Sequence, residues 1–401
     1  MKKETENFKL HAFDFEKFWS LDPEVIFLNH GSFGACPKAV LEVQQRLRQQ
    51  LEAEPVRFFG RDWEILIDNA RSKLAKFIGS DFEDLVFVPN ATTGVNAVLR
   101  SLNFSPADEI LTTNHEYNAC RNALDFIASR TGARVVVAKI PFPIASPQEV
   151  VTAVMEQVSP KTKLALLDHV TSQTALIFPI QELVKQLQAQ GVDTLVDGSH
   201  APGMIPLNLV EIGANYYVGN CHKWLCAPKG AGFLYVQRDQ QTKIRPLTIS
   251  HGANSPRTDK SRFQLEFDWM GTDDPTAYMC VPKAIDFMDS LLPGGWIELM
   301  QRNHQMVLAA RNLLCDVLEV EPVCPEEMIG SMAVLPIYGK LADWDFMFFH
   351  DQLLDRFGIE VPVIPWEGNP RLLIRISAQI YNQLEHYEYL GKVLTQVASE
   401  E

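Results

Sequence analysis

Long apolar runs are missing from this 401-residue chain, and so is a surplus of basic residues. No stretch reaches about eighteen apolar residues, so the sequence predicts no membrane-spanning helix. The opening segment, MKKETENFKLHAFDFEKF, has neither the apolar core nor the small-residue cleavage site of a secretory signal. Because 36 Lys and Arg stand against 50 Asp and Glu, giving a formal net charge of −14, we expect no nucleic-acid partner and no membrane partner.

Paired cysteines and nucleotide-binding glycine motifs are missing as well. The seven cysteines are scattered and form no CxxC motif, which argues against a disulfide framework. The spacing of Cys221, His222 and Cys226 fits no common zinc pattern. We therefore expect reduced thiols, a cytoplasmic location and no metal. Neither a Walker A sequence nor GxGxxG occurs, so a P-loop or dinucleotide site is not expected.

What the chain does contain is a series of short apolar runs that alternate with helical patterns. DLVFV, DEILTTN, ARVVVAKI, TKLALLDHV and DTLVDGS are typical of buried strands, and IQELVKQLQAQG of an intervening helix. This alternation predicts an α/β fold with a mostly parallel sheet covered on both faces. Ligands bind such sheets at the carboxyl ends of the strands. Those ends carry Asn90, Asn114, His115, His169, Asp197 and His200.

The pattern changes near Trp296. A long helical stretch is followed by the strand-like runs SMAVLPIYG and RLLIRIS and by a final amphipathic helix. We predict a large domain over residues 22–290 and a smaller C-terminal α/β domain over residues 291–401. We expect residues 1–21 to pack against the smaller domain.

Three separate motifs contain residues that could bind a cofactor or take part in catalysis. Asp197 ends a buried run, where it is either a turn residue or the partner of a protonated ring nitrogen. Lys223 lies among His222, Trp224 and apolar runs; it is either a surface charge or a desolvated amine able to form a Schiff base. The turn PNATTGVNAVL is either an ordinary helix cap or a phosphate-binding helix N-terminus. Together the functional alternatives suit pyridoxal 5′-phosphate.

The same motifs carry a family resemblance that runs along most of the chain. FLNHGSFGACPKAV, EPVRFF, NATTGVNAV, NHEYNACRNAL, DHVTSQTALIFPI, VDGSHAPG, GNCHKWLCAPKGAGFL and RISAQIYN occur in the order expected of the class V aminotransferase family. The sequence most resembles the isopenicillin N epimerase-like branch. The resemblance implies the aspartate-aminotransferase-like fold (fold type I), an enzyme with pyridoxal 5′-phosphate as cofactor, and a homodimer with shared active sites.

The resemblance also implies roles for individual residues. Lys223 would form the Schiff base and remove the α-proton of an amino acid substrate, and Asp197 would bind the ring nitrogen. Arg375 would bind the substrate carboxylate, with Asn29, His30 and Arg57 as further substrate-side candidates. The remaining expected cofactor contacts are Ala91, Thr92, Thr93, His115, Ser172, His200, His222 and Thr272. Tyr117 competes with His115 as the ring that stacks on the cofactor, and Thr272 would serve the neighbouring subunit.

Two departures from the family pattern put parts of the resemblance in doubt. Asn220 replaces a serine of many relatives, which puts that phosphate contact in doubt. The segment VPVIPWEGNPRLLI contains no cysteine, so persulfide-forming desulfurase activity is not expected. Epimerisation, transamination and β-elimination of a carbon–sulfur bond all stay open, as does cofactor binding without turnover. His30, Tyr117 and His115 are alternative second acids, although His30 could instead hydrogen-bond its own turn and Arg57 could pair at a subunit interface.

Overall fold

A seven-stranded sheet forms the centre of the computed structural model, which describes residues 15–400. Its strands lie in the order β2-β8-β7-β6-β5-β3-β4. Their bounds are Leu85–Val88 (β2), Glu109–Thr113 (β3), Arg134–Ala138 (β4), Thr162–Asp168 (β5), Asp193–Asp197 (β6), Tyr216–Asn220 (β7) and Gly232–Val236 (β8). Strands β3 to β7 pair in parallel, whereas β8 is antiparallel to both of its neighbours, β2 and β7. The predicted α/β fold with a mostly parallel sheet is confirmed.

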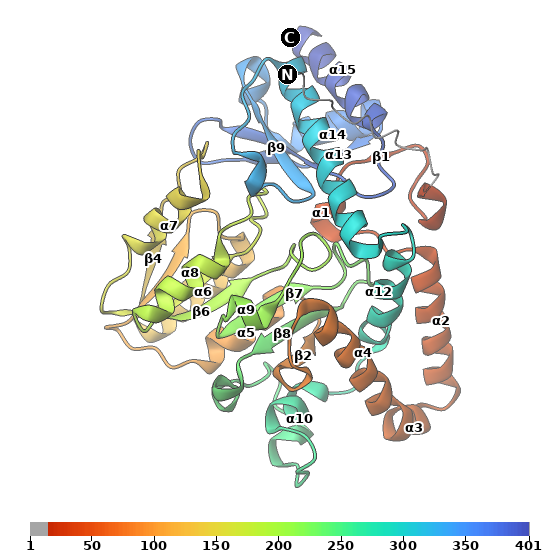
Figure 1. Cartoon of the computed structure of the whole chain (residues 1–401), viewed down its shortest axis with the longest axis vertical. Coiled ribbons are helices and arrows are strands. Elements are labelled where there is room, and N and C mark those ends of the chain that lie inside the picture. Colours follow the sequence, from red (N-terminus) through yellow and green to blue (C-terminus); the bar gives the residue numbers. More distant parts are fainter. Residues whose placement is uncertain (1–14, 401) are drawn as a thin grey trace, which may run out of the picture.

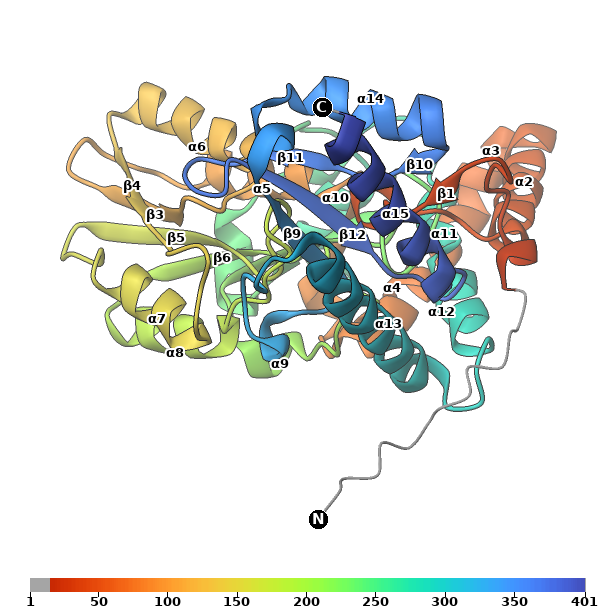
Figure 2. The same ribbon diagram turned by 90° about the horizontal axis from the view of Figure 1, so that it is seen from above.

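The sheet separates two hydrophobic cores because successive strand residues point to opposite faces. In β5, Leu164 and Leu166 pack into one core, and Ala165 and Leu167 into the other. Helices α5 (Ala91–Ser101) and α6 (Asn118–Thr131) cover the first face. Helices α7 (Pro147–Met155) and α8 (Ile180–Ala189) cover the second, as seen from above in Figure 2.

A second, smaller sheet lies at the other end of the molecule (Figure 1). It is antiparallel and consists of β11 (Val363–Pro365), β12 (Leu372–Ser377) and β9 (Met332–Ile337). Helices α13 (Gly295–Leu318) and α14 (Phe346–Phe357) contact this sheet, and α15 (Leu384–Glu400) packs on α13. Helix α12 (Val281–Asp289) packs instead against α4 (Trp63–Ile78), α2 (Lys38–Ala53) and α13. The division into domains at residue 290 stays a prediction. Among the described residues, no helix combines the length and apolar character that a membrane crossing requires.

Residues near the N-terminus pair with strands near the C-terminus. Strand β1 (Ile26–Phe27) runs parallel to β10 (Ile359–Glu360) and leads into the short helix α1 (His30–Phe33). The ring of Trp19 lies 5.1 Å from that of Tyr381 and 6.3 Å from that of Phe287. Of the N-terminal segment expected to pack against the smaller domain, residues 1–14 lie outside the described part of the chain.

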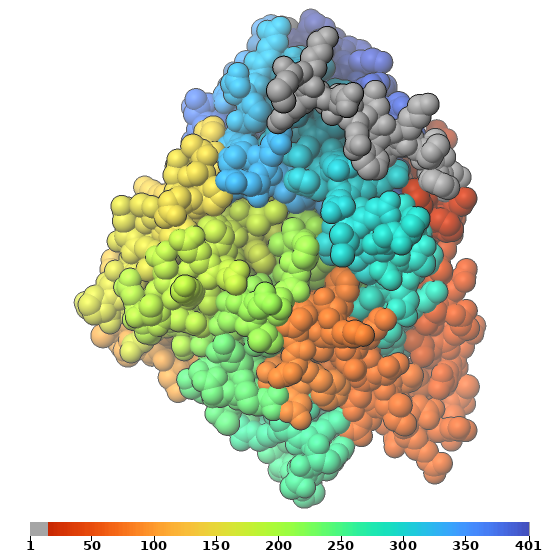
Figure 3. Space-filling view, viewed as in Figure 1, coloured from red at the N-terminus to blue at the C-terminus, as the bar shows by residue number. Residues whose placement is uncertain are grey.

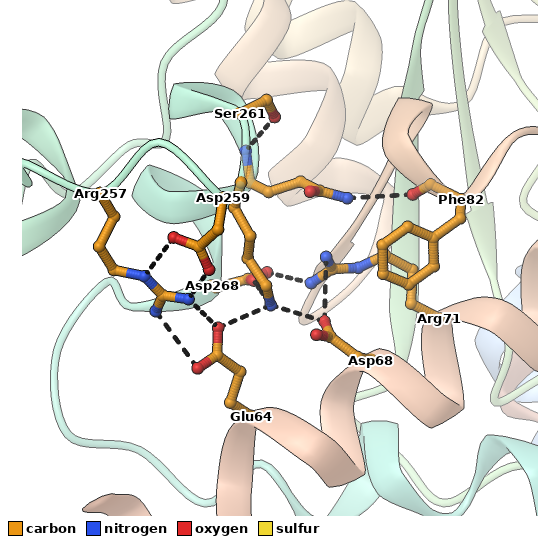
Figure 4. A network of polar contacts seen from close by, with 10 residues as sticks. Glu64, Asp68, Arg71, Phe82, Arg257, Asp259, Ser261 and Asp268 are labelled. Carbon is orange, nitrogen blue, oxygen red and sulfur yellow. Dashed lines mark hydrogen bonds and ion pairs between the residues drawn. The ribbon is translucent and has the colours of Figure 1, made fainter.

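An ionic network joins α4 (Trp63–Ile78) to the segment that enters α10 (Arg262–Asp268). The two segments lie side by side in the space-filling view (Figure 3). Arg71 is fully buried, binds Asp268, lies 3.4 Å from Asp68, and packs on the ring of Phe82 at 5.1 Å (Figure 4). Lys260 lies 2.7 Å from Asp68 and 3.6 Å from Asp268, so Arg71 and Lys260 both face carboxylates of α4 and of α10.

Candidate active site

A cavity of about 470 Å³ opens where the strands of the large sheet end. This volume is within the range of small-molecule sites. Asp168 ends β5, Asp197 ends β6 and Asn220 ends β7, so parallel strands bring these side chains to one edge. The residues lining the cavity are Ser32, Phe33, Asn90, Thr92, Thr93, Tyr117, Asp168, Ser172, Asp197, Ser199, His200, Asn220, His222 and Lys223.

The N-terminus of α5 meets this cavity directly after β2. Asn90 caps the helix, because its Oδ1 accepts hydrogen bonds from the backbone N–H of Thr93 at 2.9 Å and from the Thr93 hydroxyl at 3.1 Å. The backbone N–H of Ala91 donates to Oδ1 of Asn220 at 2.9 Å. The backbone N–H of Ala91 is therefore already hydrogen-bonded to a side chain of the same protein. Thr92 and Thr93 line the cavity at the positive end of the helix dipole, which favours an anion.

Lys223 lies in the turn between β7 and β8, beside the fully buried Trp224. Its Nζ lies 3.2 Å from Nε2 of His200. The side chain reaches the cavity but is only partly exposed, and burial, with the nearby Arg375 charge, lowers the pKa of Lys223 to about 8. Burial and the Lys223 charge hold the pKa of His200 well below its usual value. A neutral His200 can accept from the lysine at Nε2, which leaves a proton on Nδ1.

Asp197 is buried and already partly hydrogen-bonded. Its Oδ1 accepts from the backbone N–H of Ser199 at 2.9 Å and from the Ser199 hydroxyl at 2.5 Å, and its Oδ2 accepts from the thiol of Cys120 at 3.2 Å. Glu116 and Asp168 are buried next to it. Burial and mutual repulsion raise the pKa of Glu116 and of Asp168 well above their usual values. Burial and the nearby carboxyl groups therefore oppose the ionisation of Glu116 and Asp168.

His115 and Tyr117 differ sharply in position. His115 is fully buried; its Nδ1 lies 2.7 Å from the Thr174 hydroxyl and its ring lies 4.7 Å from that of Trp366. Burial lowers the pKa of His115 to about 4. Tyr117 is 44% exposed and lines the cavity. Of the two rings, the structure brings Tyr117 to the cavity wall.

Arg375 extends from β12 toward the cavity wall and is 3% exposed. One terminal nitrogen donates to the carbonyl of Ser172 and, at 3.3 Å, to its hydroxyl. The other donates to the Ser32 hydroxyl at 2.8 Å and to Oδ1 of Asn29 at 3.5 Å. Its Nε is buried and has no hydrogen-bond partner within residues 15–400. A buried donor without a partner suits an anionic ligand such as a carboxylate.

Other expected site residues lie outside the cavity of this chain. His30 is fully buried: its Nδ1 lies 2.8 Å from the Tyr381 hydroxyl, and its Nε2 lies 3.1 Å from the carbonyl of Lys223. Burial lowers the pKa of His30 to about 3, and its ring nitrogens contact distant segments rather than its own turn. The Arg57 side chain is 62% exposed, and Thr272 lies on an exposed turn.

The cavity also contains residues that motif reasoning missed. Ser32 and Phe33 belong to the motif NHGSF, and Ser199 follows Asp197 by two residues, so each lay inside a segment already singled out. Asp168 opens the motif DHVTSQTALIFPI, but a carboxylate at a strand end is also a common turn feature, so the sequence alone does not assign it to the site. Cys120 lies in the motif NHEYNACRNAL and does not line the cavity, but its thiol contacts Asp197, 77 residues away in sequence.

These residues fit pyridoxal 5′-phosphate on structural grounds. The helix N-terminus at Thr92 and Thr93 suits its phosphate, Asp197 suits a protonated ring nitrogen, and Lys223 suits its aldehyde carbon. His200 and Arg375 each have a buried nitrogen without a partner among the described atoms, so the cavity offers further donors to a bound molecule.

Relatives of this chain carry several different activities. Isopenicillin N epimerases of Amycolatopsis lactamdurans and Streptomyces clavuligerus are each 33% identical to it, over 94% and 95% of this chain and 96% of each relative. An L-cysteine desulfhydrase of Arabidopsis thaliana is 28% identical over 93% of this chain and 88% of its own.

Solved structures show the same fold at low identity. A complex of the cystine C–S lyase C-DES with its product cysteine persulfide has a TM-score of 0.76 at 22% identity, covering 92% of this chain and 96% of that one. The apo cysteine desulfurase of Thermococcus onnurineus has a TM-score of 0.79 at 20% identity, covering 97% and 98%. The family model for class V aminotransferases matches residues 26–327. The chain therefore belongs to the class V aminotransferase family, and it is an enzyme whose cofactor is pyridoxal 5′-phosphate.

Proposed function

We propose that this enzyme acts at the α-carbon of an amino acid and inverts it, as an epimerase or racemase. The observation that carries the proposal is that Lys223 and Tyr117 line one cavity, while Arg375 lies behind its wall and binds the lining residue Ser172. The similarity to two isopenicillin N epimerases at 33% identity supports it.

In this proposal Lys223, Asp197 and the start of α5 hold the cofactor. The cofactor supplies a conjugated ring that accepts the electron pair left when a bond to the α-carbon breaks. Arg375 holds the substrate carboxylate through its free Nε, with its terminal nitrogens kept in place by Ser32 and Ser172. Holding the carboxylate fixes which α-substituent faces Lys223.

Lys223 takes the α-proton. A pKa of about 8 leaves about a tenth of the amines neutral at pH 7 and about half at pH 8, which suits a base working near neutrality. His200 keeps the amine oriented from 3.2 Å because its neutral Nε2 accepts a hydrogen bond.

Inversion needs a second proton donor on the other side of the α-carbon. Tyr117 lines the cavity, whereas His30 and His115 are buried behind its wall with lowered pKa values. We therefore assign the second proton to the Tyr117 hydroxyl. His115 supports the wall through its contact with Thr174.

The second candidate function is β-elimination of a carbon–sulfur bond. The similarity to an L-cysteine desulfhydrase supports it, and the absence of cysteine from residues 361–374 does not oppose it, because a lyase that releases its sulfur product needs no enzyme thiol. In this case Lys223 still removes the α-proton, but no second proton reaches the α-carbon.

We further propose that the enzyme is a homodimer. Arg57 and Thr272 lie outside the cavity of their own chain, so each would serve the site of a neighbouring subunit. Val56 and Ile65 are 84% and 71% exposed, and a second copy would cover such apolar side chains. Light scattering on the holoenzyme, with Val56→Glu as the disruptive variant, tests the assembly.

The test of the reaction follows amino acids in D₂O. L- and D-alanine, L-cysteine and S-substituted cysteines are incubated with the holoenzyme, and NMR and chiral chromatography record α-deuterium, configuration, pyruvate and released thiol. Deuterium with inversion supports the epimerase, and pyruvate with thiol supports the lyase. Tyr117→Phe should abolish inversion but keep exchange. The absence of both α-deuterium and pyruvate with every substrate would refute both candidates.

A further inference from the structure

A hydrogen-bond chain connects the molecular surface to the buried guanidinium of Arg375. Nε2 of His350, in α14, lies 3.1 Å from one carboxylate oxygen of Glu360. The other oxygen accepts a hydrogen bond from Nδ2 of Asn29 at 2.7 Å. Oδ1 of Asn29 accepts from the Ser32 hydroxyl at 2.5 Å, and that hydroxyl accepts from Arg375 at 2.8 Å.

The chemistry of the two ends fixes the direction of every bond in this chain. Arg375 can only donate hydrogen bonds, so the Ser32 oxygen must accept from it. The Ser32 hydroxyl then donates its own hydrogen bond to Oδ1 of Asn29. An ionised Glu360 can only accept, so the amide nitrogen of Asn29 must face Glu360 and its oxygen must face Ser32 and Arg375. The opposite amide orientation would set two donors against each other at the arginine end.

The fold holds Glu360 and Asn29 next to each other independently of their side chains. Strands β1 and β10 are paired in parallel, with Phe27 opposite Glu360. The backbone N–H of Leu28 donates to the carbonyl of Glu360 at 3.0 Å, and the N–H of Ser377 donates to the carbonyl of Leu28 at 2.9 Å. The same short segment therefore connects β10, which carries Glu360, to β12, which carries Arg375.

We propose that Glu360 is a positioning residue for carboxylate binding by Arg375. By holding the amide of Asn29 in one orientation, it keeps the terminal nitrogens of the guanidinium engaged and leaves Nε free for the ligand. The inference rests on the proposed role of Arg375 and extends it to a residue that neither lines the cavity nor contacts Arg375.

The test compares two small oxyamines that react with the enzyme-bound cofactor whatever the natural substrate is. Aminooxyacetate carries a carboxylate, and methoxyamine does not. Stopped-flow absorbance of the holoenzyme gives the two rate constants, and their ratio measures what the carboxylate contributes. The ratio requires no turnover.

Four variants separate the possible outcomes. Glu360→Ala should lower the aminooxyacetate rate about tenfold, by analogy with the loss seen when a group that orients a metal ligand is removed, and leave the methoxyamine rate unchanged. Glu360→Gln should restore most of the ratio, because its amide oxygen can still accept from Asn29. Glu156→Ala, an exposed glutamate after α7, should match the wild type. Arg375→Gln should bring the ratio close to one.

The outcomes also distinguish the two proposals. If Arg375→Gln lowers the ratio and Glu360→Ala does not, the positioning role of Glu360 is wrong and the role of Arg375 stands. If Arg375→Gln has no effect, the proposed carboxylate site itself is wrong. Should Glu360→Ala fail to fold, Asn29→Ala and Ser32→Ala break the same chain at its next links and must give the same loss, or the inference is overturned.

Discussion

Replacing Lys223 with methionine should stabilise the cofactor-free protein, although most substitutions of partly buried residues destabilise. Lys223 is held in a partly desolvated site beside the Arg375 charge, and its pKa is lowered to about 8. The folded apoprotein therefore carries a charged amine where a neutral side chain would be favoured. Methionine keeps a similar length and removes the charge.

The magnitude follows from the shift in pKa. A drop from 10.5 to about 8 corresponds to about 3 kcal/mol at 1.36 kcal/mol per unit. Because the amine reaches a water-accessible cavity, we expect about 1–2 kcal/mol after solvent screening. The unfolded chain keeps its proton up to about pH 10.5, whereas the folded chain releases it near pH 8. Below pH 8 the penalty is fully present, and wild-type stability rises between pH 8 and 10.5 as the unfolded state binds more protons.

Urea unfolding of the apoprotein, followed by circular dichroism, tests this reasoning. At pH 7 the midpoint of Lys223→Met should exceed that of the wild type, and by about pH 9.5 the difference should shrink. Lys185→Met, at an exposed position in α8, serves as the matched control and should leave the midpoint unchanged. A Lys223→Met protein no more stable than the wild type at pH 7, or an advantage independent of pH, would refute the reasoning.

Three further substitutions test other parts of the structure. Arg71→Ala leaves the buried Asp268 with a weaker counter-charge and should lower the free energy of unfolding by about 3 kcal/mol, measured by urea titration. Gly34→Ala should lower both the melting temperature and the cofactor content, because φ is +68° and a Cβ would meet the carbonyl oxygen of His222 at 2.2 Å; full cofactor content would contradict this. Asn90→Ala removes the cap of α5 and should cost about 1 kcal/mol and raise the Kd for pyridoxal 5′-phosphate, measured by fluorescence quenching.

Local patterns were enough to predict the sheet and the cofactor side of the cavity. Asp197 and Asn220 follow apolar runs whose strands are parallel neighbours, so their positions at one edge follow from the fold class. The antiparallel direction of β8 was not predictable from its apolar run alone, because GFLYV is equally compatible with either direction.

The direction of a side chain and its contacts with residues far away in sequence could not be predicted from the sequence. His115 and Tyr117 are two residues apart in one motif, and only tertiary packing against Trp366 buries the first and leaves the second exposed. Glu360 gave no signal, because its partner Asn29 is 331 residues away. The roles of Arg57 and Thr272 depend on a second chain and stay predictions.

The pairing of β1 with β10 has a consequence for the order in which the enzyme is completed during synthesis. All seven strands of the large sheet precede residue 237, so the residues proposed to hold the cofactor can assemble while the C-terminal part is still being made. Asn29 leaves the ribosome 331 residues before Glu360, and Ser32 leaves it 343 residues before Arg375. The nascent protein can therefore acquire its cofactor pocket before it has a place to hold a substrate carboxylate.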